Sequence, residues 1–249
     1  MTDISADLGV SIPKLQQEFD KIITSEGLQY KAPEEAINLL IDATFFGREY
    51  GFLCFHDTQK IIYFAEIKTE TVRDLRSGLR ELKEAKYKIK SVTIDGRRGY
   101  YNAIKKILGP VPVQMCLFHQ KAIIRRYITD KPKSLCGQDL KRLMENLCKE
   151  NQQNFIDDFY KLTEIHHGTL NQRNEKGGYT HTSLRSAFRS LQTNMPYIFA
   201  YTDAQSLKIP PTINHLEGLF GHLKEKINIH RGLNKSRKKK AIKFFLKFF

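Results

Sequence analysis

Residues 36–65 read AINLLIDATFFGREYGFLCFHDTQKIIYFA. The stretch holds three short runs of β-branched, aromatic and other apolar residues, separated by tight connectors at 47–49 and 56–60. Consecutive runs of this kind are typical of an antiparallel meander. Asp42 directly follows the apolar residues 39–41, and we expect it to lie at the end of the first strand.

The pattern then changes to alternating helices and strands. Helical spacing over 71–88 is followed by a buried strand at 91–94, and a helix at 100–108 is stopped by a Gly-Pro pair. A strand at 111–117 and a helix at 119–128 complete the series. This order matches an α/β fold of the ribonuclease-H-like type, a mixed sheet flanked by helices. Other α/β sheets remain compatible with it, because periodicity does not fix topology.

The chain divides into four regions by composition. Residues 1–24 resemble a helix-turn-helix DNA-binding segment, in which Ser11 caps the second helix and Pro13 lies in its first turn. A plain amphipathic helix that docks on the main domain is the alternative. The main domain covers 36–132 and resumes at 207–249, and an α-helical insertion at 133–206 interrupts it, since the strand signal disappears there.

Charge and cysteine content narrow the class of partner and the compartment. Lys and Arg total 41 against 27 Asp and Glu, a formal charge of +14, which favours a polyanion as partner. The four cysteines show no CxxC pair and no disulfide-framework spacing, which indicates a reducing compartment. No apolar run approaches the roughly 20 residues of a membrane span, and no signal peptide is visible, so we expect a cytoplasmic protein without membrane contact.

Three acidic residues stand where a carboxylate is unexpected. Asp42 and Asp95 each follow an apolar run, and Glu217 lies near the start of a helical stretch. A carboxylate at the end of a core strand is unfavourable unless it meets a cation or a donor. Two strand-end aspartates and a late helical glutamate are what a magnesium site for phosphoryl transfer requires.

Each of these acids also has a simpler interpretation. Asp42 could bond the backbone of a turn, and Asp95 precedes a glycine in an ordinary turn pair. Asn214 and Glu217 could form a capping box at the helix start. The buried stripe that begins at Ile213 instead favours an earlier start, with Thr212 as the cap, and leaves Glu217 free.

Four short motifs, taken in order, resemble insertion-sequence transposases of the Mutator-like group. They are LIDAT at 40–44, TIDG at 93–96, QMCLFH at 114–119 and TINHLEGLFGHLK at 212–224, with HRG following at 230–232. The resemblance covers about residues 36–245. It implies a ribonuclease-H-like catalytic domain with a helical insertion ahead of the glutamate.

The resemblance also implies an activity and a set of site residues. Asp42, Asp95 and Glu217 would be the catalytic Asp-Asp-Glu triad and would bind Mg²⁺ or Mn²⁺. The chain would cleave transposon ends and transfer them into target DNA. It would act on double-stranded DNA as a dimer or larger homo-oligomer, in association with the nucleoid. Residues that match supporting positions are Cys116, His119, Asn214 and Lys224. A buried thiol and a strand-end histidine are the alternative for the first two.

Basic residues near the three acids are candidates for phosphate contacts, although a run of charges is often only a solvated face. The candidates are Arg97, Arg98, Lys121, Arg125, Arg126, His230, Arg231, Lys235, Arg237 and Lys238. Two rival functions stay open at this point. One is a domesticated DNA-binding protein without catalysis, and the other is a ribonuclease-H-like nuclease or resolvase.

Overall fold

A six-stranded mixed sheet forms the centre of the computed structural model, which describes residues 9, 11–22, 24–147, 152–229 and 232–248. The strands are β1 (Gly27–Leu28), β2 (Ile37–Phe46), β3 (Tyr50–His56), β4 (Ile61–Ile67), β5 (Ile89–Ile94) and β6 (Val113–Met115). The helices are α2 (Ile12–Lys21), α3 (Val72–Glu84), α4 (Tyr100–Leu108), α5 (Leu117–Ile128), α6 (Leu135–Asn146), α7 (Gln152–Ile165), α8 (His167–Asn171), α9 (Thr182–Ile198), α10 (Ala200–Asp203), the 3-10 turn η1 (Gln205–Leu207), α11 (Asn214–Ile229) and α12 (Lys235–Phe248).

The topology of the sheet confirms the predicted fold class. The strand order is β1-β4-β3-β2-β5-β6. β2, β3 and β4 form the expected antiparallel meander. β5 and β6 are added beside β2 and run parallel to it. Three antiparallel strands continued by two parallel strands on the side of the first one make a ribonuclease-H-like sheet, and helices cover both of its faces.

One face of the sheet packs against α3 and α4. Because side chains alternate along a strand, Leu39 and Ile41 of β2 face these helices and join the same buried core as Leu79 of α3. The helix comes unusually close at Gly78, where an added Cβ would lie 2.7 Å from atoms of the Phe55 ring. The Thr71 hydroxyl caps α3 by accepting from the backbone N–H of residue 74.

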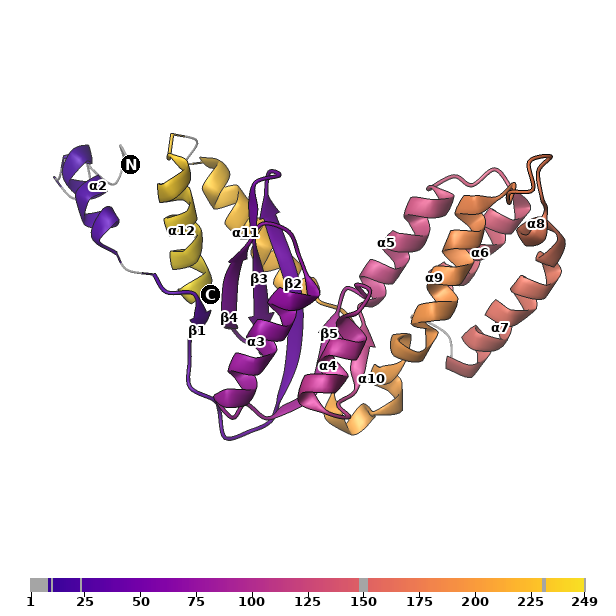
Figure 1. Cartoon of the computed structure of the whole chain (residues 1–249), viewed down its shortest axis with the longest axis horizontal. Coiled ribbons are helices and arrows are strands. Elements are labelled where there is room, and N and C mark those ends of the chain that lie inside the picture. Colours follow the sequence, from indigo (N-terminus) through magenta and orange to yellow (C-terminus); the bar gives the residue numbers. More distant parts are fainter. Residues whose placement is uncertain (1–8, 10, 23, 148–151, 230–231, 249) are drawn as a thin grey trace.

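The opposite face of the sheet packs against α11 and α12 (Figure 1). Phe52 and Phe64 of the meander meet the buried side of α11, which carries Phe220 and its neighbours in the predicted stripe. The C-terminal aromatic run contributes Phe245 to this core, while Phe248 is exposed. This face therefore receives the helix that bears Glu217.

Helices α6 to α9 extend from the β6 side of the sheet (Figure 1). They share one hydrophobic core with α5, to which Phe155, Phe159 and Leu191 contribute fully or almost fully buried side chains. Within 133–206 the described residues form helices, the turn η1 and one isolated bridge between Arg173 and Tyr179. We propose that this region is the helical insertion expected from the sequence.

The N-terminal segment is described only in part. The first helix of the predicted helix-turn-helix falls on residues 3–8, which lie outside the described residues. The second forms as α2 with Ser11 at its N-cap position and a proline in the first turn, but the Ser11 hydroxyl makes no capping hydrogen bond. A DNA-binding role for 1–24 stays a prediction. None of the helices in the described part of the chain is long and apolar enough to cross a membrane.

Two predicted strand boundaries were wrong. Asp42 lies in the middle of β2, which continues to Phe46 because Ala43–Phe46 pair with β3. The last strand is shorter than the predicted 111–117, since β6 ends at Met115 and Cys116 already occupies the N-cap position of α5. As a result, Asp42 lies inside its strand and not at its end, and Cys116 lies at the start of a helix and not within a strand.

Candidate active site

Asp42 lies level with the end of β5 even though it is inside its own strand. The last residue pair of the parallel ladder between β2 and β5 is Leu40 with Thr93, and β5 ends one residue later. Asp95 follows β5 directly, so continuing the register places Asp42 and Asp95 side by side. Strand alternation puts Asp42 on the same face as Leu40, which packs beneath the start of α11.

The electrostatic state of Asp42 shows that other carboxylates are near. The pKa of Asp42 is raised from 3.8 to about 8, mainly by burial, and the negative charges of Asp95, Glu70 and Glu217 contribute to the same shift. The backbone N–H of Ala43 donates to Asp42 Oδ1 at 2.8 Å and opposes this shift. The carboxyl groups of Asp95, Glu70 and Glu217, from three other segments of the chain, therefore all act on Asp42 at this edge of the sheet.

Asp95 is held by the turn that follows β5. Its Oδ1 accepts a hydrogen bond from the backbone N–H of Arg97 at 3.0 Å. Gly96 makes the turn possible, because its φ of +82° is a conformation that side chains with a Cβ rarely adopt. A Cβ at Gly96 would also collide with the Met115 side chain. The Asp-Gly pair is thus an ordinary turn and a positioning device for the carboxylate at the same time.

Glu70 is a fourth acid that sequence reasoning missed. It lies between β4 and α3 and is buried, with 8% of its surface exposed. Glu70 Oε1 accepts from the Tyr100 hydroxyl at 2.6 Å, and Oε2 pairs with Arg97 Nη1 at 2.9 Å. Burial raises the pKa of Glu70, and the Tyr100 hydrogen bond partly offsets this. No apolar run or motif precedes Glu70, so the sequence gives no pattern that singles it out.

Polar side chains on the α11 face of the sheet fix the loop that leads into α11. The amide of Asn38 donates to the carbonyl oxygens of Leu207 and Lys208 at 3.2 and 3.0 Å. The Thr93 hydroxyl donates to the carbonyl oxygen of Pro210 at 2.8 Å. The start of α11 is therefore positioned by the same strands that carry Asp42 and Asp95.

Glu217 faces His119 across the gap between α11 and α5. His119 Nε2 lies 3.4 Å from Glu217 Oε1, and both side chains are 28% exposed. The Nδ1 atom of His119 is buried and has no hydrogen-bond partner among the described residues. Beside it, the Sγ atom of Cys116 accepts from the backbone N–H of Ile213 at 3.5 Å, which ties the start of α5 to the start of α11.

The helix start settles the competing interpretations of Glu217. α11 begins at Asn214, and the backbone N–H of Glu217 donates to the carbonyl oxygen of Ile213 at 3.1 Å. Asn214 is therefore the first residue of the helix and not its N-cap, and Thr212 lies one residue too early to cap it. The supporting residues Asn214 and Lys224 are exposed on α11.

The basic candidates fall into two groups. Some are already paired within the chain: Arg97 with Glu70, Arg125 with Asp130, Lys235 with Glu49, and Arg237 with Asp20. The side chains of four others form no hydrogen bond or ion pair with the described residues, and these are Arg98, Lys121, Arg126 and Lys238. His230 and Arg231 lie outside the described residues.

The donor set suits a hard divalent cation in chemistry but is not arranged as a ready-made site. Carboxylate oxygens are the ligands that Mg²⁺ prefers, and a cation would offset both the burial and the repulsion that raise the pKa of Asp42. Across the residues that the structure describes, however, no group of three or more His, Cys, Asp and Glu side chains is close enough to hold a metal ion. Asp42, Asp95 and Glu217 thus fit a divalent cation by the type of their ligand atoms. The effect of Asp95 and Glu217 on the pKa of Asp42 agrees with this.

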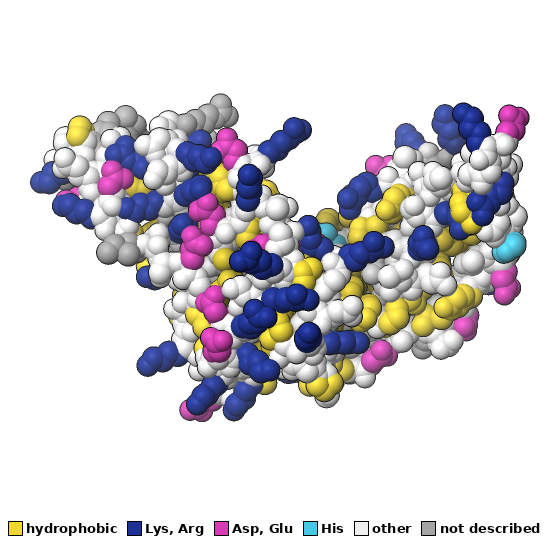
Figure 2. Space-filling view, viewed as in Figure 1, with side chains coloured by type: hydrophobic (Ala, Val, Ile, Leu, Met, Phe, Trp, Pro, Cys, Tyr) yellow, Lys and Arg dark blue, Asp and Glu magenta, His cyan; other side chains and the backbone are white. Residues whose placement is uncertain are grey.

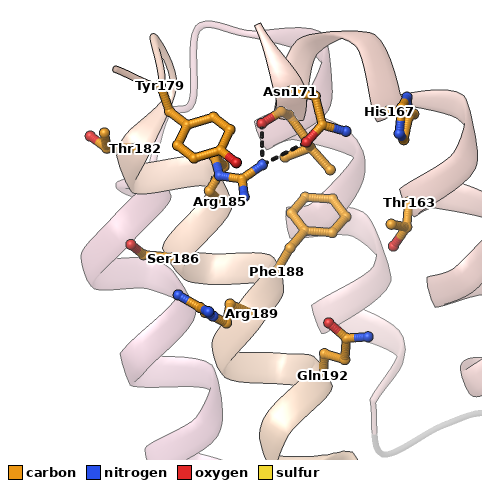
Figure 3. Close-up of a pocket in the computed structure, with 11 residues that line it drawn as sticks. Thr163, His167, Asn171, Tyr179, Thr182, Arg185, Ser186, Phe188, Arg189 and Gln192 are labelled. Atoms are coloured by element: carbon orange, nitrogen blue, oxygen red, sulfur yellow. Dashed lines mark hydrogen bonds between the residues drawn. The ribbon is translucent and has the colours of Figure 1, made fainter. Parts of the chain in front are cut away.

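A separate pocket of about 400 Å³ lies among α7, α8 and α9 (Figure 3). Arg185 is anchored at its edge by the carbonyl oxygen of Leu170 at 2.6 Å and by Asn171 Oδ1 at 2.8 Å. The Tyr179 ring stacks on the Arg185 guanidinium at 3.4 Å. Its lining includes Arg189 and no acidic side chain. The proposed triad does not contribute to it.

Several solved structures resemble this chain, among them a transposase complex and a viral intasome. No protein-family model matches the chain, and no curated protein does. One solved structure, a Drosophila P element transposase strand transfer complex, is 10% identical, with a TM-score of 0.49 over 95% of this chain and 85% of that one. A simian T-cell lymphotropic virus intasome in complex with the PP2A regulatory subunit B56 gamma is 13% identical, with a TM-score of 0.28 over 52% and 54%. The order and direction of the strands define the fold of this chain.

Proposed function

We propose that this chain is a DNA transposase of the Asp-Asp-Glu type, in which Asp42, Asp95 and Glu217 are the catalytic carboxylates. The observation that supports this most strongly is the parallel register of β2 and β5, which sets Asp42 level with Asp95 at the end of β5. The charges of Asp95 and Glu217, which contribute to the raised pKa of Asp42, support the same grouping. Acids that are buried close to one another destabilise the fold unless a cation or a donor compensates their charge. A purely structural role would be served better by neutral side chains, so the presence of these acids favours a functional role.

The proposed reaction is phosphoryl transfer in two steps. Water first hydrolyses a phosphodiester at the transposon end and frees a 3′-hydroxyl. The oxygen of that hydroxyl then bonds to a target phosphorus while the bond from that phosphorus to its original 3′ oxygen breaks. Mg²⁺ or Mn²⁺, when bound by the three carboxylates, would supply positive charge that activates the attacking oxygen and stabilises the leaving oxygen.

The residues of the chain position the carboxylates for this chemistry. Asp42 is fixed by its place in β2, and Asp95 by its hydrogen bond to the backbone N–H of Arg97. His119 orients Glu217 from the first turn of α5. Cys116 acts through the backbone of Ile213 and thereby holds the helix that carries Glu217.

Double-stranded DNA is the proposed partner. A formal charge of +14 gives the chain a long-range attraction for phosphates. Figure 2 shows Lys and Arg side chains on both sides of a broad hollow between the sheet and the helical region. We propose that residues 1–24 add DNA contacts, that the protein acts as a dimer or larger, and that it belongs to the Mutator-like group.

A nicking-and-joining assay with DNA that contains the flanking inverted repeats tests this function. The wild-type protein should cut the end and join it to target DNA with Mg²⁺ and should do neither in EDTA. Asp95→Asn should lose both steps and still bind DNA. Full activity of Asp95→Asn would refute the triad.

The same assay separates the two rival functions. A domesticated binding protein would bind DNA but neither cut nor join it in Mg²⁺. A nuclease or resolvase of this fold would cut branched or hybrid substrates without joining. Asp158→Asn is a matched control, because Asp158 is an exposed carboxylate on α7 outside the proposed site.

A further inference from the structure

Phe118 is an exposed aromatic residue in an unusual place. Its side chain is 48% exposed, although it directly precedes His119 and follows the buried residue Leu117. The Phe118 ring lies edge-on to the His119 ring, with centroids 6.0 Å apart. His119 in turn contacts Glu217 at 3.4 Å. An apolar ring is thus presented to solvent one side chain away from a proposed catalytic carboxylate.

Phe118 stands at one end of a groove between α5 and α6. Residues 118, 121, 122 and 125 follow the i, i+3, i+4, i+7 spacing and therefore share one face of α5. The groove encloses about 300 Å³, at the small end of the range for ligand pockets. Its apolar lining includes Ile124, Ile128 and Met144.

The charged side chains around the groove favour a phosphate beside Phe118, because among the described residues the acids are paired and one lysine is not. The two acids of the lining are engaged by cations, Asp130 by Arg125 at 3.7 Å and Glu145 by Lys141 at 4.0 Å. Lys121 lies one helical turn from Phe118, and its side chain has no hydrogen-bond or ion-pair partner among the described residues. A ligand with a flat apolar ring and an adjacent anion would meet both groups.

We propose that Phe118 and this groove receive an unpaired DNA base next to the phosphate that the carboxylates act on, with Lys121 contacting the neighbouring backbone. This inference rests on the proposed function, since it takes DNA as the ligand. Bases stack on exposed aromatic rings in basic grooves regardless of sequence, because every base has a π face. An unstacked base at the cleavage point would also fix the strand against sliding.

Fluorescence of a purine analogue that is quenched by stacking tests the inference without requiring catalysis. The analogue is placed at the first unpaired position of a duplex with a short single-stranded 3′ extension, and EDTA is present throughout. Wild-type protein should quench it on binding. Phe118→Tyr should retain the quenching, and Phe118→Leu should lose it. The Leu variant should bind this DNA roughly 5- to 150-fold more weakly, with unchanged affinity for fully paired duplex.

Tyr160→Leu is the matched control, because Tyr160 on α7 is also 48% exposed and lies outside the groove. It should bind and quench as the wild type does. Equal quenching by wild type and Phe118→Leu, or binding without any quenching, would overturn the base site while leaving the proposed function intact. Failure of the wild type to bind either DNA would overturn both. Self-association that Phe118→Leu abolishes, with no effect on DNA, would assign the groove to a second copy of the chain and refute the proposal.

Discussion

Replacing Asp42 by asparagine should stabilise the metal-free protein at neutral pH. The pKa of Asp42 is about 8 in the folded chain, against 3.8 for an ordinary aspartate, with burial as the main cause. The folded state therefore holds this proton more tightly than the unfolded state does. Ionisation of Asp42 has no effect on stability below about pH 4 and lowers stability progressively as the pH rises from about 4 to 8. Asparagine has a similar shape and cannot ionise.

The magnitude follows from the size of the pKa difference. One pKa unit corresponds to about 1.4 kcal/mol. At pH 7 roughly three units of the difference are expressed, which gives a destabilisation on the order of 4 kcal/mol. Urea unfolding of wild type and Asp42→Asn in EDTA, followed from pH 4 to pH 8, measures it. The two free energies of unfolding should agree near pH 4, and the variant should be more stable by a few kcal/mol near pH 8.

Asp158→Asn is the control, since this exposed carboxylate lies outside the proposed site. Its unfolding curve should follow the wild type at every pH. Addition of Mg²⁺ should recover stability in the wild type and have less effect on Asp42→Asn. If the free energies of unfolding of wild type and Asp42→Asn differ by the same amount at every pH, the pKa of Asp42 is not raised in the folded chain. That result would refute the proposed environment of Asp42.

Three further predictions concern the support of the site and its partner. Glu70→Leu should lower the free energy of unfolding by about 1–3 kcal/mol, because the buried Tyr100 hydroxyl loses its acceptor. Glu70→Gln should restore most of this stability. Equal stability of Glu70→Leu and wild type in urea would contradict the prediction. Gly78→Ala should cost about 1–3 kcal/mol through overpacking against Phe55, whereas a gain in urea stability would mean that α3 can shift outward. Arg98→Ala should reduce the slope of log affinity against log salt by about 1, measured by anisotropy with duplex DNA, and an unchanged slope would remove Arg98 from the interface.

The ribonuclease-H-like sheet could be predicted because its signals are local. Tight connectors, which the structure places at 47–49 and 57–60, join adjacent antiparallel strands, and the glycine at 109 ends α4 where the pattern indicated. The buried stripe of α11 followed from the spacing of its apolar residues. Each of these features depends on neighbours within a few residues.

The positions within the candidate site depended on partners that lie far away in sequence. Asp42 was expected to end its strand, but β2 continues because β3 pairs with it to Phe46 while β5 stops beside Asp42. Glu70 could not be found, since its burial arises from Tyr100 and Arg97, about thirty residues later. A readable signal was missed at 91, 93 and 95, where alternate polar residues in a buried strand mark the face toward α11.

The convergence of Asp42, Asp95 and Glu217 is tested most directly by anomalous scattering from crystals of the protein bound to DNA and soaked in Mn²⁺. Our account predicts density for one or two ions in contact with the carboxylate oxygens of all three residues, and loss of that density in Asp95→Asn. Ordered Mn²⁺ bound elsewhere while these three carboxylates remain without an ion, in the presence of DNA, would contradict it.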